Sequence, residues 1–173
     1  QIGKAYNSVW SKRAKKLNLV LSMQPVFETL LGNTQKGLYE GCNELYVESL
    51  GKRHLKTNMF RQILDEGIVV CAGSDSALTP VNPLLGIYSA VNHPKKDHSV
   101  KLIEAIKMFT SSAAYATFSE SERGSIAKGK KADLTVLDKD IQKVNPESIK
   151  DISVDITIRE GRIVYSRNRE ELL

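Results

Sequence analysis

Cysteine, aromatic residues and long apolar runs are all scarce in this sequence. Its 173 residues include only two cysteines, Cys42 and Cys71, which form no closely spaced pair. Because Cys71 lies inside an apolar run, we expect a buried, reduced thiol there and neither a disulfide nor a metal ligand. No apolar run approaches the ~18 residues of a membrane helix, and no charged and then apolar opening marks a signal peptide. The sequence therefore predicts a cytoplasmic protein with no membrane partner.

The positive charges are not arranged for binding nucleic acid. The chain has 25 Lys and Arg against 20 Asp and Glu, a formal net charge of +5. The basic residues are dispersed in short runs, and no aromatic residues are interleaved with them for base stacking. We therefore expect solvated basic faces and no nucleic-acid partner.

The chain is short for the largest common α/β architecture. A closed (β/α)₈ barrel rarely fits in fewer than ~200 residues and typically takes about 250, whereas this chain has 173. It opens with Gln1 and not with Met, which suggests the trimmed end of something longer. Hydrophobic residues make up 41% and charged residues 26%, a globular balance that predicts a real core.

Residues 1–119 have the pattern of an α/β body. Apolar runs at 19–23 and 68–72 are typical of strands buried on both faces, as in parallel sheets under covering helices. Helical spacing of apolar residues predicts helices over 11–17, 57–66, 84–91, about 100–109 and 111–117, the last two with Ser99 and Thr110 as N-caps. The stretch 32–49 shows no clear period, so we expect an irregular excursion there.

Residues 120–173 have a different pattern, that of a small antiparallel sheet. A short strand is predicted at 134–137. Apolar residues alternate with polar ones over 154–158 and again over 163–165, on either side of a turn at 160–161. This alternation predicts a hairpin with one wet face. We therefore divide the chain into a first segment, 1–119, and a second segment, 120–173.

The segment 124–130 has the spacing of a phosphate-binding loop without its context. Gly124 and Gly129 stand at the required spacing, with Lys130 directly after them. The next residue is Lys131, where that motif needs a Ser or Thr hydroxyl for magnesium, and a strand follows where a helix N-terminus is required. We expect a turn that leads into a strand.

Asp75 is the residue whose position points most directly to chemistry. It stands just beyond the carboxyl end of the run 68–72, the edge at which α/β sheets place their sites. Position alone leaves a catalytic role and a simple loop-capping role about even. The three histidines, His54, His93 and His98, have no metal-ligand spacing, so surface or packing roles are favoured for them.

Several segments, in order along the chain, together resemble one family. They are Ser22-Met23-Gln24-Pro25, then 64–75 ending in Gly73-Ser74-Asp75, then 82–88, then Glu104-Ala105-Ile106 ahead of Thr110, and finally 124–126, Gly129-Lys130, 132–134 and 136–138. This order resembles the C-terminal part of an amidohydrolase-superfamily enzyme, specifically amidohydrolase family 3, over about 19–165.

The resemblance implies a fold and a site. The fold would be the C-terminal portion of a (β/α)₈ TIM-type barrel, with 19–23 and 68–72 as its last two strands, followed by the C-terminal strands of a composite β-sandwich. The family binds one or two divalent metals, usually zinc. Asp75 matches the family's strand-eight aspartate, which implies a metal ligand that also acts as general base and then general acid. Gln24 and Ser74 would face a small-molecule substrate from their strand ends.

The chain also departs from the family pattern. The other metal-binding residues of the family would lie upstream of Gln1, and Lys4 would fall near the position of a ligand histidine, although lysine is a poor ligand when protonated. Because a catalytic metal needs ~three or four protein ligands, we expect this chain alone to hold no metal and to be inactive. Open strand edges predict that the rest of the barrel, a partner chain or self-association covers them.

Two functions remain open on these grounds. The first is a C-terminal fragment of a metal-dependent hydrolase that attacks a non-peptide carbon–nitrogen bond, of an amide, N-acyl or N-formyl type, with metal-activated water. The alternative is a non-catalytic structural or interaction module derived from the same fold.

Overall fold

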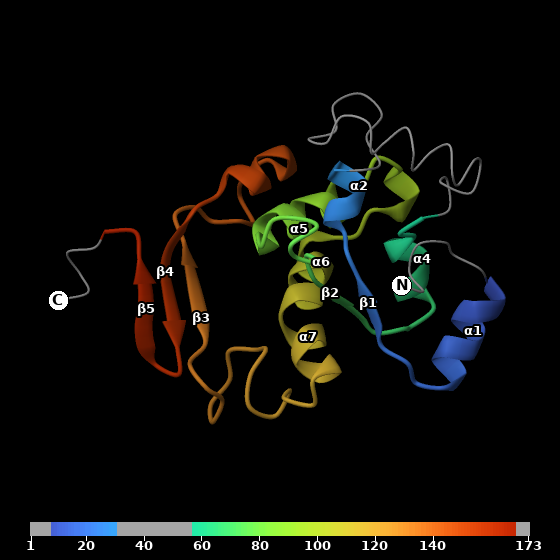
Figure 1. Ribbon diagram of the computed structural model, residues 1–173, viewed down its shortest axis with the longest axis horizontal. Helices are drawn as coiled ribbons and strands as arrows, with labels where there is room; N and C mark the ends of the chain where they lie inside the picture. The colour runs from blue at the N-terminus through green and yellow to red at the C-terminus, as the bar shows by residue number, and fades with distance from the viewer. Residues whose placement is uncertain (1–7, 31–56, 169–173) are drawn as a thin grey trace.

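Two separate sheets organise the part of the chain that the computed structural model describes, residues 8–30 and 57–168. The first sheet pairs β1 (Leu21–Met23) with β2 (Val70–Ala72). The second joins, in this order, β3 (Leu134–Leu137), β4 (Val154–Arg159) and β5 (Arg162–Ser166). Figure 1 shows the first sheet among the helices and the second at one end of the molecule. The α/β class is therefore confirmed.

The two strands of the first sheet are parallel and in register. The register pairs are Leu21 with Val70, Ser22 with Cys71 and Met23 with Ala72. The Leu21 N–H donates to the Val69 carbonyl at 2.9 Å, and the Gly73 N–H donates to the Met23 carbonyl at 3.0 Å. Parallel strands need a long crossover connection, so β1 and β2 meet across the intervening chain.

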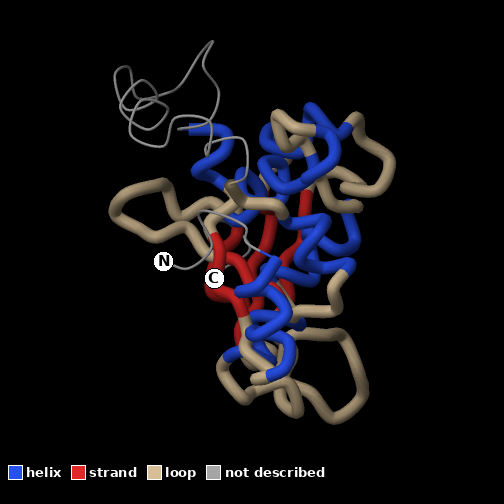
Figure 2. The backbone as a smooth tube through the Cα atoms, turned by 90° about the vertical axis from the view of Figure 1, so that its right-hand side faces the viewer, coloured by secondary structure: helices blue, strands red, loops and turns tan. Residues whose placement is uncertain are grey.

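Helices lie around this strand pair, as the two views in Figures 1 and 2 show. Their bounds are α1 Ser8–Lys16, α2 Val26–Leu30, α4 Phe60–Asp65, α5 Pro83–Val91, α6 Leu102–Phe109 and α7 Ser111–Ala116, with short 3₁₀ helices η3 Lys96–His98 and η4 Pro146–Asp151. The α4, α6 and α7 helices all contact β2. The predicted stretch 32–49 lies outside the described residues.

The core forms where these helices cover β2. Its most deeply buried large side chains include Phe60, Met23, Met108 and Val70, all of which are 1% exposed or less. Cys71 is buried with a free thiol, as predicted. Burial of large apolar side chains at this level stabilises a fold by about 1.5–3 kcal/mol each.

Helix α5 is positioned by a cap at one end and a close contact in its middle. The Asn82 side chain accepts a hydrogen bond from the Leu85 N–H at 3.1 Å, and Pro83 occupies the first turn. Gly86 lies directly against α6, because a Cβ at this position would be 2.2 Å from the Phe109 ring. The sequence therefore specifies both where α5 begins and how closely it packs.

Three sequence expectations about the first segment need correction. Helix α6 begins after Lys101 and not after Ser99, because the Glu104 carboxylate accepts the Lys101 N–H at 2.8 Å. Thr110 does precede α7, but its hydroxyl donates back to the Ile106 carbonyl and does not cap α7. Strand β1 is not buried on both faces, because Ser22 is exposed.

The second sheet confirms the predicted hairpin. The face opposite the wet one, however, is not fully buried. Strands β3, β4 and β5 are antiparallel neighbours, and the register places Leu134, Ile158 and Ile163 side by side. Along this apolar face Val136 is 43% exposed and Ile163 44% exposed. Both faces of the sheet are therefore at least partly wet, because none of the described elements covers the apolar one.

The second segment also contributes to the core of the first. Ile149 of η4 is 1% exposed and belongs to the same buried cluster as Ile87 and Ala90 of α5. The Asn92 side chain donates to the Pro146 carbonyl at 2.9 Å, which ties α5 to η4. The division at 119 and 120 stays a prediction, and the core crosses it.

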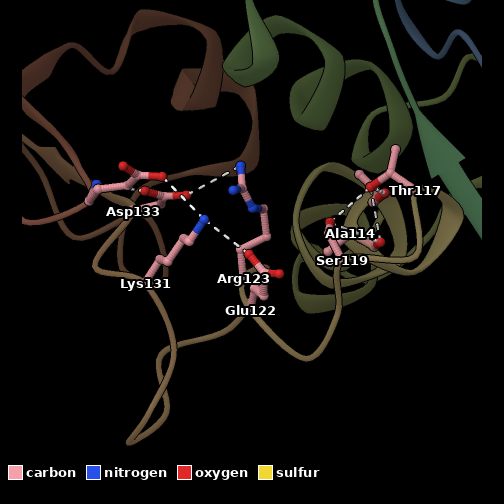
Figure 3. A network of polar contacts seen from close by, with 9 residues as sticks. Ala114, Thr117, Ser119, Glu122, Arg123, Lys131 and Asp133 are labelled. Atoms are coloured by element: carbon pink, nitrogen blue, oxygen red, sulfur yellow. Dashed lines mark hydrogen bonds and ion pairs between the residues drawn. The ribbon is translucent and has the colours of Figure 1, made fainter.

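Charged residues link the loop after α7 to the residues around the second sheet, and Figure 3 shows Glu122, Arg123, Lys131 and Asp133 among them. The Lys131 ammonium lies 3.0 Å from the Glu122 carboxylate and 3.2 Å from that of Glu160 in the β4–β5 turn. The Arg123 guanidinium lies 3.7 Å from the Asp133 carboxylate, just before β3. Because water reaches these pairs, each contributes little to stability.

The loop that resembles a phosphate-binding motif is a turn before β3, as expected. The Lys130 ammonium donates to the Glu120 carbonyl at 2.6 Å and to the Ser125 hydroxyl at 2.7 Å. Its charge therefore serves to close the loop on itself. Gly124 and Gly129 both have positive φ, of 85° and 90°.

Replacing Gly124 and Gly129 by alanine, one at a time, gives two matched variants that test the packing around Gly124. A Cβ at Gly124 would lie 2.5 Å from the Ala114 Cβ, whereas a Cβ at Gly129 would meet no atom within 4 Å. Gly129→Ala should cost only the positive-φ penalty of about 1–2 kcal/mol. Gly124→Ala should cost about 2–4 kcal/mol, because overpacking is added to that penalty. Urea unfolding of both variants measures the difference, and equal losses would contradict the described contact.

The exposed apolar side chains predict association of the 173-residue chain. They include Trp10 at 60%, Leu17 at 58%, Val81 at 77% and the apolar face of the second sheet. Exposed apolar side chains, together with strand edges that no described strand pairs with, favour burial against another surface. Sedimentation velocity over a range of concentrations should show dimers or larger species. A strictly monomeric chain at every concentration would refute this expectation.

Candidate functional site

The carboxyl ends of β1 and β2 form one edge, and the predicted site residues follow directly from it. Gln24 comes after β1, and Ser74 and Asp75 come after β2. The in-register pairing and the hydrogen bond from the Gly73 N–H to the Met23 carbonyl hold the two strand ends side by side. The structure therefore brings together, at the level of the backbone, the residues that the sequence placed at this edge.

Asp75 presents a carboxylate that is available for chemistry. Its side chain is exposed, and within residues 8–30 and 57–168 no hydrogen bond or ion pair is found for it. Its backbone has a φ of 55°, in the left-handed region that few residues other than glycine adopt. Aspartate tolerates this region better than most residues do, so the conformation is compatible with the side chain.

The loop after β2 is closed by hydrogen bonds on both sides of Asp75. The Leu78 N–H donates to the Asp75 carbonyl at 2.9 Å. The Thr79 hydroxyl donates to the carbonyl of Ser74, and the Thr79 side chain is buried. Sequence reasoning missed Thr79, because no spacing marks it; the only available signal was a hydroxyl in a proline-bounded loop, where such groups often bond to the backbone.

Gln24 and Ser74 are both half-buried at the edge. The Gln24 carbonyl accepts the Phe27 N–H at 3.2 Å, which begins α2 immediately after the strand. Their predicted contact with a substrate stays a prediction. Lys4, which the sequence placed near a possible ligand position, lies outside the described residues.

The donor groups among the described residues bear on the metal that the resemblance implies. Within the described ranges no group of three or more His, Cys, Asp or Glu residues could hold a metal ion. Three or four ligands are the norm for a zinc site. The described residues therefore do not fit a metal site on their own, and what they offer at the strand edge is the single carboxylate of Asp75.

Comparison with known proteins gives the family. The sequence pattern of the amidohydrolase family named Amidohydro_3 matches residues 11–165. The chain belongs to the amidohydrolase family. This confirms the resemblance inferred from the ordered segments of the sequence. Among the described helices of this amidohydrolase chain, none has the length and apolar character that crossing a membrane would require.

Two curated relatives extend well beyond this chain. The YtcJ protein of Bacillus subtilis (strain 168), which is named as an amidohydrolase, is 35% identical over 168 residues, which cover 91% of this chain and 30% of YtcJ. The N-substituted formamide deformylase of Arthrobacter pascens is 29% identical and is matched over 94% of this chain and 34% of its own length. The chain thus spans about a third of the length of these relatives.

A solved structure shares the fold. The adenosine deaminase of Xanthomonas campestris, with bound Zn, has a TM-score of 0.68 at 11% sequence identity. The match covers 95% of this chain and 36% of that protein. At this level of identity the likeness concerns the fold alone.

A second polar cluster in this amidohydrolase chain lies buried between α2, α4 and η3. The His93 and His98 rings are 5.1 Å apart, and both side chains are buried. The Glu28 carboxylate accepts a hydrogen bond from the Asn58 side chain at 2.6 Å, and its other oxygen is 3.6 Å from His93 Nε2. Of the two roles left open by the sequence, packing is therefore the one observed for His93 and His98. His54 is outside the described residues.

The buried cluster keeps His93 neutral. Its Nδ1 accepts the Lys95 N–H at 3.0 Å. Burial, with smaller contributions from the charges of His98 and Lys95, lowers the pKa of His93 to about 4. Burial also lowers the pKa of His98 and of Lys95. In a neutral imidazole the nitrogen without a proton accepts a hydrogen bond, which agrees with the Lys95 N–H contact at Nδ1.

This arrangement predicts a loss of stability in mild acid. The folded pKa of His93 lies below its ordinary value of 6.5, so the unfolded chain binds a proton that the folded chain does not. The contribution of His93 to the free energy of unfolding should be fully present above its ordinary pKa of 6.5. It should be lost as the pH drops towards about 4. The difference in pKa corresponds to a total of up to about 3 kcal/mol.

The matched variants are His93→Asn and His98→Asn. An asparagine oxygen can replace His93 Nδ1 as the acceptor for the Lys95 N–H without titrating. Urea unfolding at about pH 7 and about pH 5 should show that His93→Asn removes most of the acid sensitivity, whereas His98→Asn retains most of it. Equal acid sensitivity in the wild type and His93→Asn would show that His93 is not its source.

Proposed function

We propose that this chain is the C-terminal portion of a metal-dependent hydrolase that cleaves a non-peptide carbon–nitrogen bond, of an amide, N-acyl or N-formyl type. The observation that carries the proposal is Asp75, whose exposed carboxylate lies at the shared carboxyl edge of two parallel strands. Membership of the amidohydrolase family supports it. A relative named as an N-substituted formamide deformylase supports the choice of bond.

In this proposal β1 and β2 are the last two strands of a (β/α)₈ barrel, and the second sheet is part of a composite β-sandwich. The parallel register and the helices packed on β2 support the barrel part. The half-exposed apolar face of β3, β4 and β5 supports a second layer of sheet over it. The segments 1–119 and 120–173 are the contributions of this chain to the two domains.

Asp75 is proposed to move the proton during hydrolysis. Its carboxylate accepts a proton from the attacking water as the oxygen bonds to the substrate carbonyl carbon. The carboxylic acid then returns that proton to the nitrogen as the carbon–nitrogen bond breaks, so that the base is regenerated and an acid and an amine leave. A carboxylate suits both steps because it accepts a hydrogen bond when charged and donates one when protonated.

The complete enzyme is proposed to contain a divalent metal, zinc, which supplies Lewis acidity when bound. Asp75 is the one ligand that the described residues would add to it. Gln24 and Ser74 are proposed to contact the substrate, because an amide and a hydroxyl can both hydrogen-bond to a carbonyl oxygen or an N–H group. The 173-residue chain alone is expected to show no turnover.

The alternative function is a non-catalytic interaction module of the same fold. The apolar side chains exposed on α1 and on the second sheet favour it. The coding region upstream of Gln1 discriminates between the two. A continuous reading frame that encodes a His-x-His strand supports the hydrolase, and a start codon close by supports the module.

Asp75→Asn tests the proposed proton transfer in the complete enzyme. Hydrolysis of an N-alkylformamide and of an N-acyl amine should fall by about 10²–10⁴-fold, since that is the usual contribution of a positioned acid or base. The matched control is Asp65→Asn, which removes an exposed carboxylate from α4 whose partner among residues 8–30 and 57–168 is Arg61, one turn away. Circular dichroism should show both variants folded. Retained turnover in Asp75→Asn would reject the role.

A further inference from the structure

The loop between β2 and α5 contains a buried hydroxyl that the proposed reaction does not itself use. We propose that Thr79 is a positioning residue, which holds Asp75 in the orientation that proton transfer requires. This inference rests on the proposed function, because it concerns the same carboxylate. The Thr79 side chain is 4% exposed, and its hydroxyl donates to the carbonyl of Ser74.

The two hydrogen bonds of this loop hold the two peptide planes that flank Asp75. The Ser74 carbonyl belongs to the plane before Asp75, and the Thr79 hydroxyl holds that plane. The Asp75 carbonyl belongs to the plane after it, and the Leu78 N–H holds that one at 2.9 Å. The relative rotation of the two planes defines φ and ψ of Asp75. Together the two bonds therefore set the direction in which its side chain leaves the backbone.

Asp75 needs this support because its backbone is not in a relaxed conformation. A φ of 55° lies in the left-handed region, which is less favourable than the right-handed one for a residue with a Cβ, even for aspartate. Such a conformation persists only where the surroundings over-determine it. The Asp75 carboxylate is exposed and has no partner among residues 8–30 and 57–168, so no described side chain fixes its direction. The orientation of the carboxylate therefore depends on the Asp75 backbone, and the two hydrogen bonds of the loop hold that backbone.

Of the two hydrogen bonds that hold this loop, the one from Thr79 can be removed by a substitution. The Leu78 contribution comes from the backbone and is retained by most substitutions, whereas the Thr79 contribution comes from a side chain. A β-branched side chain is restricted at χ1, so its hydroxyl is held ready for the Ser74 carbonyl. Loss of the hydroxyl would leave that carbonyl without the bond and would free the plane before Asp75.

Comparing Thr, Val, Ser and Ala at position 79 separates the effect of the hydroxyl from the effect of side-chain packing. Thr and Val have nearly the same shape and differ in the hydroxyl, whereas Ser keeps the hydroxyl without the methyl group and Ala has neither. In the complete enzyme, Thr79→Val and Thr79→Ala should lower kcat for an N-alkylformamide by about 10–100-fold, as expected for a misplaced reacting group. Thr79→Ser should stay within about threefold of the wild type, and KM should change much less than kcat in all variants.

The opposite pattern would overturn the proposal. If Thr79→Val matches the wild type while Thr79→Ser is slow, packing is what matters at this position, and the hydroxyl does not position Asp75. Failure of the proposed function gives a different result, because Asp75→Asn would then retain turnover. Loss of turnover in Asp75→Asn together with full activity in Thr79→Val and Thr79→Ala rejects only the role of Thr79.

A second measurement needs no turnover and uses the 173-residue chain. A positive φ brings the amide and α protons of a residue close together, which gives a strong intraresidue nuclear Overhauser effect. Asp75 should show this effect in the wild type and in Thr79→Ser, and should lose it in Thr79→Val and Thr79→Ala. If the Val variant fails to fold, the comparison of Ser with Ala decides. A strong effect retained in the variants without a hydroxyl would contradict the proposal.

Discussion

The hydrogen bonding between β1 and β2 is the constraint on which the rest of the structure depends. Parallel pairing places Met23 and Ala72 opposite each other, so the chain leaves both strands at the same edge. Without this register Gln24 and Asp75 would have no reason to lie near each other, since they are separated by the crossover. The helices that cover β2 hold the pair in place, with Phe60 and Met108 fully buried between them.

Much of this arrangement can be predicted from local sequence. The apolar runs at 19–23 and 68–72 are short, which favours strands over the longer helical patterns around them, although Ser22 interrupts the first run and is exposed. The position of Asp75 then follows from the rule that α/β sheets place their sites beyond the strand ends. The cap of α6 shows where such rules stop. Ser99 is a good N-cap residue, but the contact between Glu104 and the Lys101 N–H decides where the helix begins.

Other features depend on contacts between distant parts of the chain, which no local pattern shows. The buried cluster joins elements far apart in sequence: Glu28 lies beside His93 and accepts a hydrogen bond from Asn58, and His93 packs against His98. Thr79 has no spacing that marks it, since its partner is a backbone carbonyl made available by the turn of the loop. Alternation does predict which side of the second sheet is apolar, but not how much of it the described elements cover.

The pairing of the two strands can be measured in solution. In the isotopically labelled chain, scalar coupling across a hydrogen bond connects an amide nitrogen to the carbonyl carbon that accepts its proton. The account predicts correlations from Gly73 nitrogen to Met23 carbonyl carbon and from Leu21 nitrogen to Val69 carbonyl carbon. Absence of both, with correlations seen in the second sheet of the same sample, would show that the strands do not pair in this register, and the placement of Gln24 and Asp75 at one edge would be wrong.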